Sequence, residues 1–424
     1  MNPSEPGTDR LPGPLHSASY RLLLTGQSVS SFGNAITPVA LAFAVLDLGG
    51  SATQLGLVVG GYATAEVVTV LFGGVIGDRL PRGLVMQGTA AVSALAQALI
   101  AASLIGGWSS LTLLALVSVA NGCVSSLGQP SSQAMTQLTV SAANLPTAIS
   151  IRRLASNGAQ VAGFASAGIL VAEFGSGWAI AVDSVTFIVA AICFALIRVA
   201  ASTPVAADSM LRELKAGAAE VFRHTWLWVL IGQALVYHLF YGGVQGVLGP
   251  IVVKSAYGEA AWGWALALLM IGFMVGGLVT LRFRPSRGLF VGTAFLALTA
   301  CFPAALSALS TRPVSAFDAG LGLVFAGAFL HGFGLEIFSV NWDLSIQQNV
   351  APEKLARVYS FDAVGSFVAR PIGLALTGPV AQAIGYSRWL AVVAALMAVS
   401  TLLALLVPAI RHLERPLLPE FPTR

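Results

Sequence analysis

"AMTQLTVSAANLPTAIS", residues 134–150, resembles "LSIQQNVAPEKLARVYS", residues 344–360, and this repeat indicates how the chain is organised. The two stretches start 210 residues apart, since 344 minus 134 is 210, and Gln137 then falls on Gln347. Later glycines keep the same offset, with Gly163, Gly168 and Gly175 falling on Gly373, Gly378 and Gly385. Self-similarity over so long a period indicates one structural unit that occurs twice in the chain.

The composition is that of a membrane protein. Only 9% of the 424 residues are charged and 56% are hydrophobic, whereas soluble domains carry about 25% charged residues. The mean hydropathy is +0.82. Stretches of about 20 apolar residues are long enough to cross a bilayer as helices. We therefore expect an all-α membrane protein of twelve transmembrane helices in two pseudo-symmetric six-helix bundles.

The predicted spans fall into two sets of six. The first set covers residues 22–46, 54–76, 84–105, 109–131, 154–173 and 178–198. The second set covers residues 226–252, 260–281, 288–309, 318–343, 360–382 and 388–410. Around them we expect an N-terminal tail (1–20), a first bundle (21–198), a linker (199–225), a second bundle (226–410) and a C-terminal tail (411–424).

The basic residues indicate the orientation of the chain. An even number of spans puts both termini on one side, and 18 of the 22 Lys and Arg residues are then assigned to that side. The positive-inside rule predicts that both termini are cytoplasmic. We interpret these residues as topology signals, so no nucleic-acid partner is expected. The first 20 residues lack the apolar segment of a secretory signal.

The stretch "GGVIGDRLPRG", residues 73–83, places several charges in one short turn. Its counterpart in the second half, "GGLVTLRFRPSRG" at residues 276–288, keeps the glycines and arginines. The counterpart has no acid, so Asp78 belongs to the first copy only. Topology explains the shared arginines but leaves Asp78 without an explanation.

Several stretches give the chain a family resemblance. They are "YRLLLTGQSVSSFGNAITPVALAFAVLDL" (20–48), "GGVIGDRLPRG" (73–83), "GFASAGILVAEFG" (163–175), "VDSVTF" (182–187) and "VFRHTWL" (221–227). Together with the duplicated six-helix unit, they resemble the major facilitator superfamily of secondary transporters, in the bacterial branch of macrolide, multidrug and enterobactin exporters. The resemblance implies transport by alternating access.

The resemblance also implies a role for the charged turn. Gly74, Asp78, Arg79 and Arg82 match the family pattern, which implies a conformational latch against the cytoplasmic end of the eleventh helix. We expect Asp78 to interact with the N-terminus of that helix. We expect Arg79 or Arg82 to form an ion pair with Asp362. The alternative is a plain cytoplasmic turn whose charges only fix topology.

Several positions depart from the family pattern, among them Gly83, which replaces the last basic residue of the charged turn. Pro81 stands where glycine is usual, Phe164 stands where antiporters have proline, and Asn34 stands where related exporters often have an acid. The predicted span 109–131 also lacks the arginine of many proton antiporters. The expectation of proton coupling therefore rests on the resemblance to the exporter branch of the family, and no sequence motif of this chain supports it.

Ionisable residues inside the spans are the next candidates, because each costs about 2.5–3.5 kcal/mol at the centre of a bilayer. Glu66 and Arg370 are each midway through a span, and we predict that they pair, either as a switch or as a static contact. Glu336 can carry the coupling proton or attract a cationic substrate. Its alternative is a neutral, hydrogen-bonded acid that only packs.

Polar side chains indicate the substrate cavity. Gln27, Ser31, Asn34 and Thr37 recur at spacings of three to four, which predicts one polar face of a helix. Further candidates from the second half are His238, Tyr241, Gln245 and His331. A lone histidine in a helix is more often a packing residue, and that alternative stays open for His238.

No catalytic or metal-binding motif appears, and the cysteines Cys123, Cys193 and Cys301 are too far apart in the sequence for a metal cluster. We expect neither an enzyme nor a cofactor. The prediction is proton-coupled export of amphipathic organic compounds, such as a drug, macrolide or siderophore. The protein would act as a monomer in the bacterial inner membrane, with a small-molecule substrate, protons and the lipid bilayer as partners. The alternatives are an importer of a small solute and a non-transporting scaffold.

Overall fold

The computed structural model describes residues 13–77, 81–199, 210–283, 285–310 and 319–414. Within these ranges the ordered elements are all helices. A short 3₁₀ turn, Pro14–His16, precedes helix α1, and Ser17 caps that helix by accepting a hydrogen bond from the Tyr20 amide at 3.2 Å. The first six long helices are α1 Ala18–Asp47, α2 Ala52–Gly77, α3 Arg82–Ile105, α4 Leu111–Thr139, α5 Leu145–Phe174 and α6 Ser176–Ala195.

The helices of the second half are more interrupted. A π turn separates α8 from α9 just before Pro250, and a 3₁₀ turn separates α11 from α12 just before Pro303. A proline lacks the amide that would continue the helical hydrogen bonds, which explains both irregularities. The elements are α7 Met210–Arg223, α8 Thr225–Gly243, η3 Val244–Leu248, α9 Gly249–Tyr257, α10 Glu259–Arg282, α11 Gly288–Leu296, η4 Ala297–Ala300, α12 Cys301–Leu309, α13 Ala319–Asn349, α14 Pro352–Phe367, α15 Ala369–Ile384, α16 Tyr386–Leu406 and α17 Pro408–Arg411.

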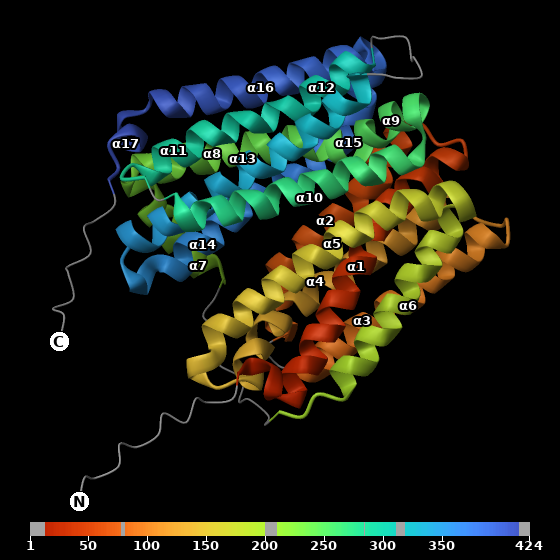
Figure 1. The fold of residues 1–424 in the computed structure, drawn as a ribbon, viewed down its shortest axis with the longest axis horizontal. Helices are drawn as coiled ribbons and strands as arrows, with labels where there is room; N and C mark the ends of the chain where they lie inside the picture. The colour runs from red at the N-terminus through yellow and green to blue at the C-terminus, as the bar shows by residue number, and fades with distance from the viewer. Residues whose placement is uncertain (1–12, 78–80, 200–209, 284, 311–318, 415–424) are drawn as a thin grey trace, which may run out of the picture.

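The predicted membrane spans each coincide with a helical segment. Eleven segments within the described ranges are long and apolar enough to cross a membrane, and α2, a helix of 26 residues, coincides with the remaining predicted span. The fold is an all-α membrane protein with two bundles, as Figure 1 shows: α1 to α6 lie on one side and α8 to α16 on the other. The fifth span begins earlier than predicted, at Leu145 instead of residue 154.

The repeated glycines have matching roles in the two bundles. Gly163 and Gly373 permit close packing within each bundle, because an added Cβ would lie 2.3 Å from the Phe32 carbonyl oxygen and 1.7 Å from that of Leu239, respectively. The last pair, Gly175 and Gly385, ends α5 and α15 with φ of 85° and 96°, a conformation that favours glycine. The repeat found in the sequence is therefore a repeat of helix contacts and helix ends.

The bundles contact each other mainly through α5 with α10 and α2 with α15. A Cβ on Gly168 would lie 2.7 Å from the Glu259 carbonyl oxygen, and a Cβ on Gly378 would lie 2.5 Å from Thr53 Cα. These contacts lie where α5 and α15 end and where α2 and α10 begin. We call this the far side, and the side where α1 begins and α17 ends the terminus side. Figure 1 shows the bundles converging on the far side and separating toward α7 and α14.

Helix α7 of the linker packs against α14. A Cβ on Gly217 would lie 2.4 Å from the Arg357 carbonyl oxygen, and Val221 is fully buried. Lys354 of α14 donates a hydrogen bond to Glu220 of α7 at 2.8 Å. The linker helix α7 is therefore held on the second bundle by packing and by this hydrogen bond.

Acid is expected to loosen this linker helix. The hydrogen bond from Lys354 is the main cause that lowers the pKa of Glu220 in the folded protein. Its contribution to stability is complete above the ordinary glutamate pKa of about 4.3 and is lost as the pH falls through the lowered value. The protection of α7 amides, measured as the exchange rate relative to the intrinsic rate at the same pH, should therefore fall in acid, and Glu220→Gln should lower that protection already at neutral pH. Glu353→Gln, at an exposed acid of the same region, should have no such effect; equal exchange in both variants would contradict the role of Glu220.

Candidate functional site

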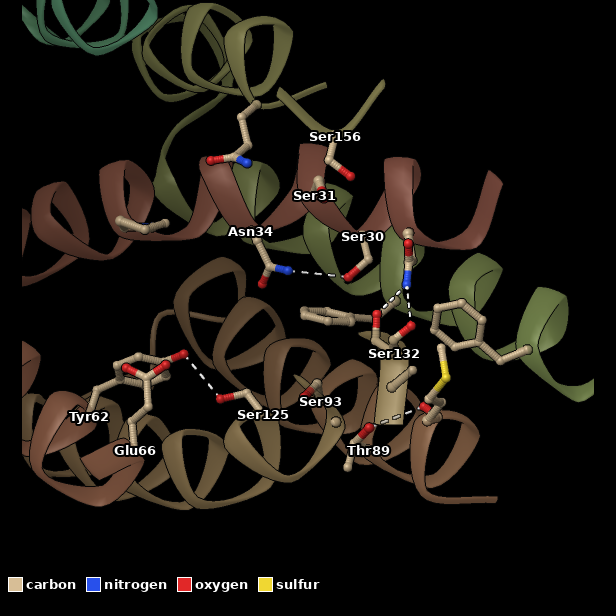
Figure 2. Close-up of a pocket in the computed structure, with 18 of the residues that line it drawn as sticks. Ser30, Ser31, Asn34, Tyr62, Glu66, Thr89, Ser93, Ser125, Ser132 and Ser156 are labelled. Carbon is tan, nitrogen blue, oxygen red and sulfur yellow. Dashed lines mark hydrogen bonds between the residues drawn. The ribbon is translucent and has the colours of Figure 1, made fainter. Parts of the chain in front are cut away.

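A cavity of about 640 Å³ lies among the helices of the first bundle and reaches Arg370 of the second. Eleven of its 20 lining residues are Ser, Thr, Tyr, Asn or Gln, so its wall is rich in hydrogen-bonding groups. It extends from Glu66 and Arg370, in the middle of the spans, toward Arg152 and Ser132 near the terminus side. Figure 2 shows hydroxyl groups pointing into this space from several helices: Ser30, Ser31, Ser93, Ser125, Ser132 and Ser156.

Helix α1 supplies the polar stripe that the sequence predicts. Gln27, Ser31 and Asn34 line the cavity. The Gln27 amide nitrogen donates to the Ser132 hydroxyl of α4, and its Oε1 is buried with no hydrogen-bond partner. The Asn34 amide donates to the Ser30 hydroxyl at 3.2 Å. This part of the stripe presents groups that can hydrogen-bond to a bound molecule.

Thr37, the fourth residue of the stripe, is not a lining residue of this cavity. Its hydroxyl donates to Asp183 of α6, and Gln97 of α3 donates to the same hydroxyl at 3.2 Å. Asp183 is fully buried and also accepts from Thr186 at 3.1 Å. Gly33 makes room for this network, since a Cβ there would lie 2.0 Å from Asp183 Oδ1. Asp183 therefore joins α1 to α6, in line with a structural role.

Glu66 and Arg370 both line the cavity, from opposite bundles. No ion pair within 4.0 Å links the two among the described residues. Their pairing therefore stays a prediction. Tyr62, one turn before Glu66, shares a hydrogen bond of 3.1 Å with Ser125, and Figure 2 shows the side chains of Tyr62 and Glu66 side by side at the cavity.

Glu336 of α13 has a partner that the sequence did not identify. Its side chain is almost fully buried, and its Oε1 lies 3.7 Å from Arg153 Nη2 of the other bundle. Its second oxygen, Oε2, is buried without a hydrogen-bond partner. The predicted start of the fifth span at residue 154 had placed Arg153 in the loop before that span. Helix α5 begins at Leu145, so Arg153 projects from a helix.

The aromatic and histidine candidates of the second half form a packed cluster within that bundle. His331 is fully buried, and its ring nitrogens form hydrogen bonds with the Tyr237 hydroxyl and the Thr299 carbonyl, each at 2.8 Å. The Tyr241 ring stacks on His331 with 4.1 Å between the ring centres.

The other two candidates of the second half lie elsewhere in that bundle. His238 forms a hydrogen bond with the Ala234 carbonyl at 2.8 Å, and Gln245 lies in the π turn. None of the four candidates, His238, Tyr241, Gln245 and His331, is a lining residue of the cavity described above.

The charged turn is only partly visible. Gly74 lies in α2 and Arg82 begins α3, whereas Asp78 and Arg79 lie outside the described residues. Asp362 of α14 accepts a hydrogen bond from the Trp342 indole at 3.2 Å. The latch between this turn and Asp362 stays a prediction.

An ion cluster on the far side was not foreseen. Lys254 Nζ of α9 lies 2.5 Å from Asp47 Oδ1 of α1 and 3.1 Å from Glu259 Oε1 of α10. The ammonium also lies 5.4 Å from the centre of the Phe43 ring. We call Lys254, Asp47 and Glu259 the far-side cluster. It joins the two bundles where they are packed together, on the side opposite the termini.

Two helical bundles that enclose a polar cavity inside a membrane define a multi-pass membrane transporter. Residues 23–317 match the Major Facilitator Superfamily, and the chain belongs to this family. It is 25% identical over 376 residues to the uncharacterized MFS-type transporter YfiS of Bacillus subtilis (strain 168), covering 86% of this chain and 87% of that protein. It is 24% identical over 404 residues to the multidrug efflux pump Tap of Mycolicibacterium fortuitum, covering 93% and 96%.

Solved structures support the same fold. The nucleoside transporter NupG superposes with a TM-score of 0.71 at 12% identity, covering 93% of this chain and 100% of that one. A bacterial homologue of the iron transporter ferroportin, in its inward-facing state, superposes with a TM-score of 0.69 at 16% identity, covering 93% and 98%. At these sequence identities the similarity shows a shared fold only. The shared fold agrees with the fold predicted from the sequence.

Proposed function

We propose that this transporter exports amphipathic organic compounds, such as a drug, macrolide or siderophore, across the bacterial inner membrane in exchange for protons. The observation that carries the proposal is the cavity that runs toward the terminus side while the bundles are joined on the far side. With cytoplasmic termini, as the basic residues favour, this arrangement can take up a compound from inside the cell. Similarity to a multidrug efflux pump supports the direction.

Alternating access then requires the two sides to exchange roles. The far-side cluster and the glycine contacts have to separate, and the bundles have to close on the terminus side. The latch predicted from Asp78, Arg79 and Arg82 would stabilise that second state by reaching α14, where Asp362 lies. The protein can complete this cycle as a monomer, since both bundles belong to one chain.

Glu336 is our proposed carrier of the coupling proton. A buried carboxyl in a membrane span is costly when charged, and its unpartnered oxygen leaves room for a proton. Arg153 reaches it from the opposite bundle, so the electrostatic environment of Glu336 changes when the bundles move. This geometry links the protonation of one residue to the relative position of the bundles.

Transport into everted membrane vesicles tests the proposal. We expect accumulation of at least one compound from a panel of drugs, macrolides and siderophores when a pH gradient, acidic inside, is imposed. A protonophore should abolish the accumulation, and vesicles without the protein provide the background. Accumulation that ignores the gradient would contradict proton coupling, and net loss of compound from loaded everted vesicles would favour import.

A further inference from the structure

The side chains that line the cavity include more basic than acidic groups. Arg152 and Arg370 line it from opposite bundles, and Glu66 is its one lining acid among the described residues. With these three groups ionised, the wall carries two positive charges and one negative charge. A low-dielectric site of this kind favours a bound anion over a cation.

Two lining groups in the described part of the chain lack a hydrogen-bond partner. They are Nε of Arg152 and Oε1 of Gln27, both buried from solvent. The Gln27 side chain belongs to a residue that is only 9% exposed and faces the cavity. Neither atom has accessible surface, so a ligand reaches it only after the side chain turns toward the cavity. A buried polar group without a partner costs about 1–3 kcal/mol, and a bound molecule that supplies the missing bond favours that turn. Arg152 needs an acceptor, and Gln27 needs a donor such as a hydroxyl group.

The remaining lining residues also favour a polar ligand. Hydroxyl groups such as those of Ser31, Ser93 and Ser156 can donate or accept, so they suit a ligand with several hydroxyl groups. Aromatic contact is limited to Tyr62, Phe187 and Phe194. A lipophilic cation would need more aromatic surface and more acids than this wall offers.

We infer that the cavity binds an organic anion that carries several hydroxyl groups, with its acidic group attracted by the arginines that line the cavity, Arg370 in the middle of the spans and Arg152 toward the terminus side. The serine, asparagine and glutamine side chains replace the water around its hydroxyl groups. Glu66 lines the same cavity as Arg370, and its negative charge competes with the ligand for that arginine. The inference rests on the proposed function only in taking this cavity as the substrate site.

Equilibrium binding to the purified protein in lipid nanodiscs tests this ligand class without any gradient. The probes are nitrophenyl glucuronide and nitrophenyl glucoside, which differ in a carboxylate on an otherwise matched hydroxylated ring. We expect the glucuronide to bind about tenfold more tightly, a difference of about 1.4 kcal/mol. Arg370→Gln and Arg152→Gln should each reduce this preference, whereas Glu66→Gln should increase it.

The control is Arg388→Gln, which removes an exposed arginine on the far side and should leave the preference unchanged. Arg370→Lys and Arg152→Lys retain the positive charge and should keep part of the preference. They show whether a loss in the glutamine variants comes from the missing charge or from misfolding. Equal binding of the two probes, no binding of either, or tighter binding of tetraphenylphosphonium would each overturn the inference. Because no gradient is used, failure here is distinguishable from failure of proton-coupled export.

Discussion

Export driven by a pH gradient is expected to fall by about hundredfold in Glu336→Gln, in line with the loss of a positioned proton-transfer group. Glutamine keeps the shape of the side chain but cannot bind and release a proton. It also removes the negative charge that faces Arg153 at 3.7 Å. The measurement is the initial rate of accumulation in everted vesicles with and without the gradient.

Exchange measurements separate proton coupling from simple loss of structure. Glu336→Gln should still bind substrate and should still exchange labelled for unlabelled compound across the membrane, because neither process needs net proton movement. Glu336→Asp retains the carboxyl group and should keep measurable gradient-driven export. If Glu336→Gln retained full gradient dependence, Glu336 would be the packed, neutral acid that the sequence left as an alternative.

The fold could be predicted from the sequence because the membrane imposes a strong pattern. Apolar stretches of about 20 residues set the helices, and the offset of 210 residues revealed the duplication. The glycines that carry this offset turned out to be contact points, as with Gly373 against the Leu239 carbonyl. Close helix contacts of this kind can be recognised in the sequence, because they require glycine and a larger residue would not fit.

The site could be predicted only in part, because its contacts join distant segments. The polar stripe of α1 was visible as a spacing, and its residues Gln27, Ser31 and Asn34 line the cavity of the first bundle. The same spacing could not show that Thr37 faces Asp183 instead. Arg152 and Arg153 were misplaced because a hydropathy pattern ends a span at charged residues, whereas a helix next to a polar cavity can continue through them.

A shift toward opening on the far side is expected when Lys254 is replaced by methionine. Lys254 joins Asp47 of the first bundle to Glu259 of the second, and its side chain is 28% exposed, so solvent screens these pairs in part. We expect a loss of about 1 kcal/mol, or a change of about fivefold in the ratio of the two states. The measurement is the distance distribution between spin labels at Leu48 and Arg388, which lie at far-side helix ends of the two bundles, in a background without the native cysteines.

Charge reversal tests whether the ion pair itself holds the far side closed. Lys254→Asp and Asp47→Lys should each increase the long-distance population, and the double variant should restore the short distance, because opposite charges again face each other across the bundles. Lys354→Met, which removes a lysine of the terminus side, is the matched control and should leave the far-side distance unchanged. If Lys254→Met also left it unchanged, the close packing at Gly168 and Gly378 would be sufficient to keep the bundles together. The energy that has to be overcome for far-side opening would then lie in backbone contacts and not in charge.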